Sequence, residues 1–194
     1  HPSAEEARAY LRDRELDGEA VETFQLGYAP AGRDTTRRWA QKHGFSEKQL
    51  VAAGALGESE RGRYERFRDR LMIPLRDLSG RVVAFSGRVL PSSSHPAKYL
   101  NSPETALFHK SRMLFCLDRA RRPMVDGRTA LLCEGQLDTI RCHLSGFEQA
   151  VAPQGTALTA DHARLLKRYA DRVVLVFDPD GAGRAAAVRS AGLL

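Results

Sequence analysis

The segment VVLVFDPDGAG, residues 173–183, joins an apolar run to two aspartates and two glycines. The same order of residues occurs earlier in the chain, where the apolar run of ALLCEGQLD, residues 130–138, ends in Glu134 and Gly135. From residue 129 onward, segments of strand character alternate with helical patterns. Because this alternation is typical of a parallel sheet, it predicts an α/β segment. We expect strands at 129–133, 149–152 and 172–177, and helices at 136–145, 159–169 and from about 181.

Acidic residues follow two of these expected strands, at the edge of the sheet where ligands of such folds bind. Glu134 follows one strand, and Asp178 and Asp180 follow another. Residues two apart in an extended segment point the same way, so both aspartates can face one site. Three crowded carboxylates repel one another unless a cation neutralises them, and Mg²⁺ prefers such oxygen ligands. The pattern therefore predicts a divalent metal site, although Glu134 and Asp178 could instead cap helices.

The preceding residues divide into a helical and a strand-rich segment. In residues 1–60 we expect a helix from a capping box at Ser3–Glu6 to about Arg14, and two more at 35–44 and 46–54. In residues 61–128, the runs RLMIPLRD and RVVAFSGRV, joined by LSG, predict a hairpin.

Positive charge is concentrated in the strand-rich segment. Residues 61–128 hold 15 Lys or Arg against 6 Asp or Glu, whereas the counts are 8 against 11 in residues 1–60 and 7 against 7 in residues 129–194. A local basic excess is typical of a protein with a polyanionic partner. The alternative is an ordinary solvated face.

Composition excludes several classes of protein. With 194 residues, 42% of them apolar, the chain can bury a core as one large or two small domains. No apolar run approaches the roughly twenty residues that span a bilayer, and HPSAEEARAY at the N-terminus has no signal-peptide pattern, so we expect a cytoplasmic protein without membrane contact. The cysteines at 116, 133 and 142 form no C-x-x-C pair, so we expect buried thiols rather than a zinc site or a disulfide framework.

Several motifs resemble one family. E-G-x-x-D after a strand and D-x-D-x-A-G after a later one resemble the toprim domain of bacterial DnaG-type primases, topoisomerases and some nucleases. RFRDRLMIPLRDLSGRVVAFSGRVL, KYLNSPET and FHKSRMLF resemble the RNA polymerase domain of bacterial DNA primase, and APQGTALTADHARLL resembles its link to toprim. The resemblance covers nearly the whole chain. It implies an α+β N-terminal subdomain, with a helical part at 1–60 and a basic part at 61–128. An α/β toprim subdomain with a parallel central sheet would follow at 129–194, incomplete at its C-terminus.

The resemblance also implies roles for individual residues. The metal-site and catalytic acids would be Glu134, Asp178 and Asp180, with Glu134 either a ligand or a general base, and Asp138 would orient the site. The positions associated with nucleotide and template binding would be Arg68, Arg70, Arg88, Lys98, Tyr99, Asn101 and Lys110. Arginine can bind phosphate through two hydrogen bonds, lysine acts as a point charge, and an aromatic ring can stack on a base.

The implied activity is template-directed synthesis of short RNA primers from ribonucleoside triphosphates on single-stranded DNA, with one or two Mg²⁺ or Mn²⁺ ions and no zinc in this chain. We expect a monomer. The replicative helicase would be contacted through a domain absent here. Two other functions remain open, a toprim topoisomerase or nuclease and a non-catalytic module that binds single-stranded DNA. Ribonucleotide incorporation on a single-stranded template would separate all three.

Overall fold

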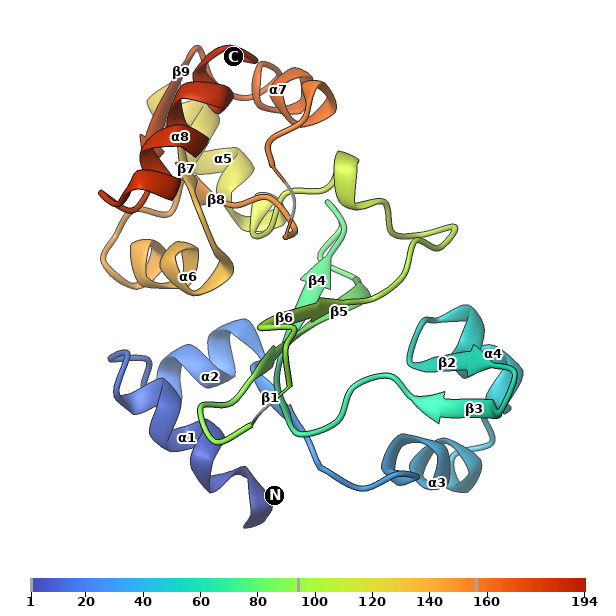
Figure 1. The fold of residues 1–194 in the computed structure, drawn as a ribbon. Helices are drawn as coiled ribbons and strands as arrows, with labels where there is room; N and C mark the ends of the chain where they lie inside the picture. Colours follow the sequence, from blue (N-terminus) through green and yellow to red (C-terminus); the bar gives the residue numbers. More distant parts are fainter. Residues whose placement is uncertain (1, 94, 156) are drawn as a thin grey trace. The chain divides into compact units, whose positions relative to one another are not determined.

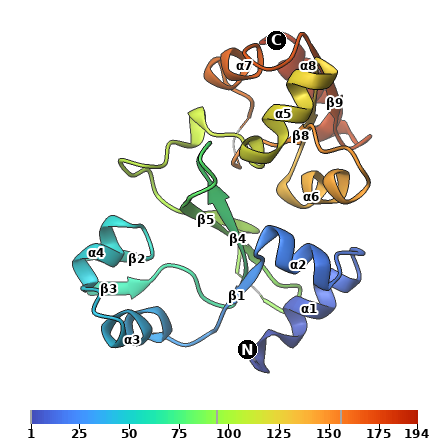
Figure 2. The ribbon, with the colours of Figure 1, turned by 180° about the vertical axis from the view of Figure 1, so that it is seen from behind.

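The structure is a computed structural model that describes residues 2–93, 95–155 and 157–194. The chain forms two compact units, one made of His1–Pro74 and Val83–Phe108 and the other of Leu75–Val82 and His109–Leu194. Each unit has its own elements, which Figure 1 labels along the chain and Figure 2 shows from behind.

The first unit combines short helices with antiparallel strands. Its largest sheet has the order β1-β4-β5-β6, and β2 and β3 form a separate antiparallel ribbon. The tip of the β4–β5 hairpin, Leu75–Val82, belongs to the second unit. The elements are η1 (Pro2–Ala4), α1 (Glu5–Arg12), α2 (Gly18–Phe24), β1 (Gly27–Ala29), α3 (Thr35–Lys42), α4 (Glu47–Ala52), β2 (Leu56–Ser59), β3 (Gly62–Glu65), β4 (Arg70–Arg76), β5 (Val82–Val89) and β6 (Tyr99–Asn101).

Local sequence explains where several of these elements begin. The Ser46 side chain accepts a hydrogen bond from the Gln49 N–H, and the Gln49 side chain accepts one in return, which confirms the predicted helix start of α4. The predicted capping box at Ser3 is wrong. Residues 2–4 form a turn of 3₁₀-helix, and the N-cap is Ala4, with no side-chain cap.

The hairpin predicted in residues 61–128 is confirmed. Asp77 Oδ1 accepts hydrogen bonds from the N–H groups of Ser79 and Arg81, and Gly80 takes the positive φ of 79° that closes the turn. The helical prediction for residues 1–60 was incomplete, because β1 and β2 lie there as well.

The second unit is built on a three-stranded parallel sheet of order β8-β7-β9. Strands and helices alternate as the sequence predicts, but β8 is shorter than expected, α7 ends earlier, and α5 was not predicted. The elements are η2 (Lys110–Arg112), α5 (Leu117–Gly127), β7 (Thr129–Cys133), α6 (Gln136–Leu144), β8 (Ala150–Val151), α7 (Ala160–Leu166), β9 (Arg172–Val176) and α8 (Gly181–Ala191).

Alternation along β7 places helices on both faces of this sheet. Ala130 and Leu132 belong to the apolar core that includes Met124 of α5 and Leu166 of α7. Neighbouring residues in a strand point to opposite faces, so the side chain of Cys133 lies on the other face, where it contacts α6. The buried central strand holds the turn after Cys133 in place.

The fold class inferred from the sequence is confirmed: a mixed helical and antiparallel region precedes a segment with a parallel sheet and helices. Within the described ranges, no helix is both long and apolar enough to cross a membrane.

Candidate active site and nucleic-acid-binding residues

Two of the predicted acids meet at the carboxyl edge of the parallel sheet. Because Cys133 and Val176 are register partners in β7 and β9, the turns that follow these strands lie side by side. Glu134 Oε2 accepts a hydrogen bond of 3.3 Å from the N–H of Asp178. Both side chains are exposed, so they can reach a ligand from solvent.

Asp180 starts α8 and has a structural task as well. Its Oδ1 accepts a hydrogen bond of 2.7 Å from the N–H of Gly183, which makes it the N-cap of the helix. The N-cap residues are Gly135 for α6 and Asp180 for α8, so neither Glu134 nor Asp178 takes the cap position that was the alternative to metal binding. Its second oxygen, Oδ2, remains available to a ligand, and Asp180 is exposed.

Two glycines allow the backbone to pack closely around these acids. A Cβ atom at Gly183 would lie 2.1 Å from the carbonyl oxygen of Asp178, so the first turn of α8 can only approach the aspartate loop without a side chain there. A Cβ atom at Gly135 would lie 2.9 Å from Oδ2 of Asp138, which places that acid against the Glu134 turn. Asp138 is exposed and lies in the first turn of α6.

The donor set of this edge fits a hard divalent cation. In the parts of the chain that the structure describes, Glu134, Asp178 and Asp180 have no ion-pair partner, so their charge is not neutralised by lysine or arginine. The same ranges contain no group of three His, Cys, Asp or Glu side chains already close enough to hold a metal ion. The acids therefore offer oxygen ligands that still have to converge, together with water and phosphate, around an ion.

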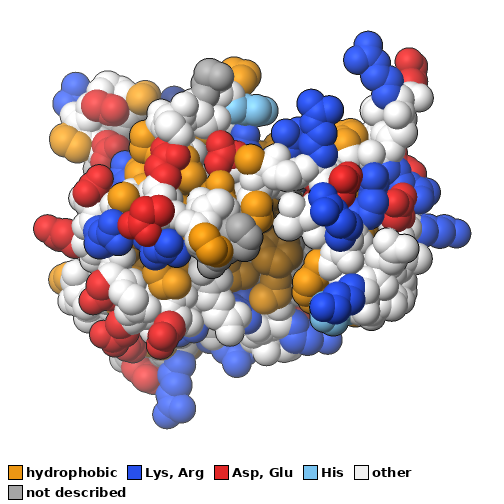
Figure 3. Space-filling view, turned by 90° about the horizontal axis from the view of Figure 1, so that it is seen from below, with side chains coloured by type: hydrophobic (Ala, Val, Ile, Leu, Met, Phe, Trp, Pro, Cys, Tyr) orange, Lys and Arg blue, Asp and Glu red, His pale blue; other side chains and the backbone are white. Residues whose placement is uncertain are grey.

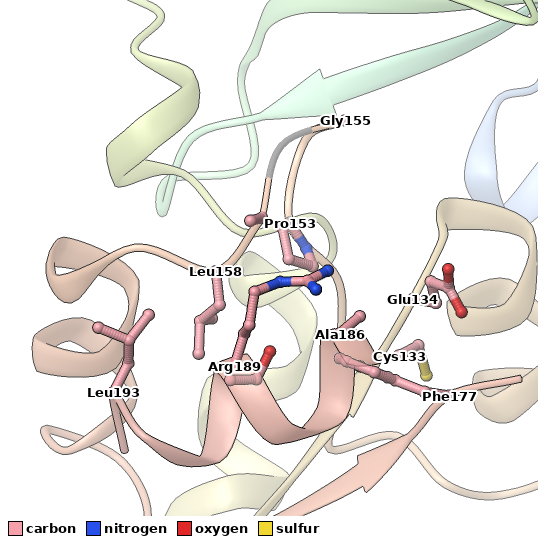
Figure 4. A pocket seen from close by; sticks show the side chains of 11 residues that line it. Cys133, Glu134, Pro153, Gly155, Leu158, Phe177, Ala186, Arg189 and Leu193 are labelled. Atoms are coloured by element: carbon pink, nitrogen blue, oxygen red, sulfur yellow. The ribbon is translucent and has the colours of Figure 1, made fainter. Parts of the chain in front are cut away.

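A cavity of about 310 Å³ lies beside the acids and is shown in Figure 4. Apart from Glu134 and Arg189 its lining is uncharged and largely apolar, with Leu158, Phe177 and Leu193 among the wall residues. Asp178 and Asp180 do not line it. The apolar walls do not suit a triphosphate, so this cavity is not a candidate phosphate site.

The β4–β5–β6 sheet buries two of the predicted phosphate-binding arginines. Arg70 is 2% exposed and donates hydrogen bonds to the carbonyl oxygens of Gly87 and Ala97 and to Nδ1 of His95. Burial lowers its pKa from the ordinary value. Its bonds connect β5 to the segment before β6, so Arg70 holds the sheet together from inside.

Arg88 is also buried, at 7% exposed. Its guanidinium lies 4.1 Å from the ring centre of Tyr10 and 5.8 Å from that of Tyr99, and it donates to the carbonyl oxygen of Val89. Arg88 and Tyr99 are register partners in β5 and β6. Arg88, which the resemblance associates with nucleotide and template binding, is thus buried between two tyrosines rather than presented at the surface.

The other predicted binding residues are more accessible. Arg68, Lys98 and Tyr99 are exposed, and Asn101 is half-buried. Arg68 uses Nε to bind the carbonyl oxygen of Ala31, which leaves its terminal nitrogens for a ligand. Lys110 is half-buried and belongs to the second unit, where its carbonyl oxygen pairs with Nε2 of His162 at 3.0 Å.

Two residues that sequence reasoning missed position this region. Arg66 is half-buried and donates two hydrogen bonds, of 3.1 and 2.8 Å, to the carbonyl oxygen of Asn101. Tyr10 packs on Arg88 from α1. Neither contact has a local sequence signal, because the partners lie 35 and 78 residues apart.

Basic side chains do not form an uninterrupted surface on the face shown in Figure 3, where Lys and Arg are interspersed with Asp and Glu. On this face the positive charge is therefore not gathered into one basic patch, and the candidates for nucleic-acid contacts remain the exposed members of the predicted set, Arg68, Lys98 and Tyr99.

Comparison with known families assigns both parts of the chain. Residues 1–121 match the family model described as DNA primase catalytic core, N-terminal domain, and residues 128–194 match the toprim domain. Toprim domains generally bind divalent metal ions.

Individual relatives agree with these matches. The DNA primase of Deinococcus radiodurans is 52% identical over 177 residues, which cover 90% of this chain and 31% of that protein. The chain spans about a third of the length of the curated relatives that it matches.

Solved structures give the same result. The RNA polymerase domain of Mycobacterium tuberculosis primase DnaG, in complex with a double-stranded DNA oligomer with a 6-nucleotide overhang, superposes with a TM-score of 0.87 at 38% identity, covering 95% of this chain and 60% of that one. A DnaG primase catalytic domain bound to single-stranded DNA has a TM-score of 0.84 and 40% identity, covering 98% and 59%.

Proposed function

Because the chain belongs to the DnaG-type DNA primases and matches their catalytic core, we propose that it supplies the active site for synthesis of short RNA primers from ribonucleoside triphosphates on single-stranded DNA. The observation that carries this proposal is the meeting of Glu134 with the loop of Asp178 and Asp180 at the carboxyl edge of the parallel sheet.

In this proposal Glu134, Asp178 and Asp180 hold one or two Mg²⁺ or Mn²⁺ ions. When bound, such an ion stabilises the negative charge that develops as the 3′-hydroxyl attacks the α-phosphate and pyrophosphate leaves. The N–H of Asp178 orients the Glu134 carboxylate, and the cap at Gly183 orients that of Asp180. Both bonds restrict the Glu134 and Asp180 carboxylates before a nucleotide arrives, which lowers the cost of bringing the ligands together.

The accessible cations would position nucleotide and template. Arg68 and Lys98 are exposed and can bind phosphate, Tyr99 can stack on a base, and Asn101 and Lys110 can add polar contacts. Arg70 and Arg88 act differently in this proposal. They keep Tyr99 and the segment around Lys98 in place through their own buried contacts.

Single-stranded DNA is the template that the proposal requires, and one similar structure is a DnaG catalytic domain bound to it. Binding by Arg68, Lys98 and Lys110 displaces counterions, so affinity should fall steeply as salt rises. Affinity for an oligonucleotide that stays flat between about 50 and 200 mM salt would contradict a phosphate-based interface.

The test of activity is incorporation of labelled ribonucleotides on a single-stranded template with Mg²⁺ or Mn²⁺. We expect Glu134→Gln to reduce incorporation by about 100-fold or more, because one ligand is lost. The matched control is Glu148→Gln, which changes an exposed acid in the loop before β8, at the opposite end of the sheet.

Different outcomes identify the two other functions. Cleavage or relaxation of DNA without ribonucleotide incorporation would assign the acids to a nuclease or topoisomerase. DNA binding without either reaction, unchanged by Glu134→Gln, would leave a binding module.

A further inference from the structure

The thiols of Cys133 and Cys142 are in contact next to Glu134 of the proposed metal site. Cys133 is the last residue of β7 and fully buried, and Cys142 is a partly exposed residue of α6. Their sulfur atoms are 3.7 Å apart, with one thiol donating to the other. No C-x-x-C motif signals this pair, because α6 returns Cys142 to the strand nine residues later.

We propose that Cys133 and Cys142 form an oxidation-sensitive pair that closes into a disulfide and thereby weakens metal binding at Glu134. The oxidant is a peroxide. The Cys142 sulfur attacks one peroxide oxygen, the O–O bond breaks, and water leaves as Cys142 becomes a sulfenic acid. The Cys133 sulfur then attacks the Cys142 sulfur, the S–O bond breaks, and a second water leaves. Two thiols and one hydrogen peroxide thus give one disulfide and two waters.

Access and distance favour this order of events. Only Cys142 of the two is reached by solvent, so a peroxide meets it first. The Cys133 thiol is already in contact with the Cys142 sulfur, so it is placed to attack the sulfenic acid. A disulfide of ~2.05 Å requires the sulfurs to approach by about 1.7 Å from their 3.7 Å separation.

The movement that brings the two sulfur atoms together can displace the turn that contains Glu134. β7 is paired on both sides, with β8 and β9, so any movement beyond rotation of the two side chains falls on α6 and the turn at Glu134 and Gly135. Gly135 is tied to α6, since its carbonyl oxygen accepts hydrogen bonds from the N–H and the hydroxyl of Thr139. Glu134 meets the Asp178 loop through a single bond of 3.3 Å.

Figure 4 shows Cys133 and Glu134 next to each other at the end of β7. A shift of α6 toward Cys133 therefore moves Gly135 through its bonds to Thr139, and with it the turn that positions the Glu134 carboxylate. Displaced ligand supports typically cost a metal site about 10- to 100-fold in affinity.

The first experiment maps the bond. Trypsin cleaves after Arg141, which separates Cys133, in peptide 129–141, from Cys142, in peptide 142–164, while Cys116 lies in peptide 113–119. After treatment with hydrogen peroxide we expect the cross-linked pair 129–141/142–164 and a mass loss of two hydrogens, both reversed by dithiothreitol. Cys116→Ala should behave like the unchanged protein, and Cys142→Ala should form no cross-link. A bond to Cys116, a bond between chains, or sulfinic acid at Cys142 without cross-linking would overturn the proposal.

The second experiment measures Mn²⁺ affinity of the reduced and the cross-linked protein by titration. This part rests on the proposed function. We expect the cross-linked protein to bind Mn²⁺ at least about tenfold more weakly, and the affinity of Cys142→Ala to be insensitive to peroxide. If the reduced protein binds Mn²⁺ and the cross-link leaves the affinity unchanged, the coupling is wrong and the metal site stands. If the reduced protein binds no Mn²⁺, the metal-site assignment fails with the coupling, while the peptide map still decides the thiol pair.

Discussion

The acids at the ends of β7 and β9 and the arginines inside β4 and β5 are all charged residues in apolar sequence, but they occupy opposite environments. Glu134 and Asp178 are exposed in turns that follow the strands. Arg70 and Arg88 are buried within their strands and bind backbone oxygens or aromatic rings. A charged residue that follows a strand can bind a ligand from solvent. A charged residue within a strand that faces the core needs partners in the protein itself, because burying an unpaired charge costs free energy.

The largest expected effect is the loss of Arg70. Arg70→Ala leaves the carbonyl oxygens of Gly87 and Ala97 without their donor in a buried region. We expect a fall in the free energy of unfolding of about 2–4 kcal/mol, measured by urea denaturation. The control, Arg68→Ala, should change it by less than about 0.5 kcal/mol. Equal effects of the two changes would remove the distinction between buried and exposed arginines.

Arg88 and Lys98 should show the same contrast between a buried and an exposed cation, with a smaller loss of stability for the buried one. Arg88→Ala removes a cation packed between Tyr10 and Tyr99, and we expect a loss of about 1–2 kcal/mol. Lys98→Ala should leave stability nearly unchanged and weaken binding of a single-stranded oligonucleotide. Measuring the free energy of unfolding and the oligonucleotide affinity of Arg88→Ala and Lys98→Ala tests whether the buried cation acts on stability and the exposed one on binding. If Arg88→Ala weakens oligonucleotide binding and leaves the free energy of unfolding unchanged, Arg88 is a ligand-binding residue.

The sequence predicted the second unit better than the first for a physical reason. Its strands are apolar runs bounded by turn residues, and β7, α6 and β9 lie within a residue of their predicted bounds. In the first unit β1 and β6 are three residues long, too short for any periodicity, and they are set by pairing with β4 and β5. The helix α5 was missed because Pro123 lies inside it.

The residues of the candidate site also divide into those whose role the sequence predicts and those whose role it does not. The acids were found because strand ends carry a topological meaning in parallel sheets. The buried role of Arg88 could not be found, since the contact with Tyr10 depends on how α1 packs. Arg66 and Asn101 are a second case: a side chain binds a backbone oxygen, which no pattern of residue types encodes.

Asp180 is exposed but also supports the structure as the N-cap of α8, so it gives a finer test. Asn caps a helix about as well as Asp, so Asp180→Asn should change stability without metal by only a few tenths of a kcal/mol, while Asp180→Ala should cost about 1 kcal/mol. If Asp180 also binds metal, both variants should lose part of the rise in melting temperature that Mg²⁺ produces. An Asp180→Asn protein with an unaltered response to Mg²⁺ and full ribonucleotide incorporation would reduce Asp180 to a cap.

The smallest effect concerns pH. His162 is fully buried, and its ring bonds to the carbonyl oxygen of Lys110 and the N–H of Thr159. Burial lowers the pKa of His162 below its ordinary 6.5. Below that pH the unfolded chain takes up the proton first, so stability should fall as pH decreases through the range beneath 6.5.

His162→Gln keeps an acceptor for the helix cap and removes the titration. We expect a flatter dependence of the melting temperature on pH between 6.5 and 5, with part of the slope remaining, because burial also lowers the pKa of His143. An unchanged slope would mean that groups other than His162 determine acid sensitivity.

Gly181 and Gly183 look interchangeable in the sequence, but they should respond in opposite ways to a methyl group. At Gly181 a Cβ atom would meet nothing within 4 Å, so alanine there should restrict the unfolded chain and raise stability by about 0.4–1 kcal/mol. At Gly183 the Asp178 carbonyl excludes any side chain. In a library that randomises both positions and is selected for folded protein, we expect the selected variants to carry many different residues at position 181. At position 183 they should retain glycine.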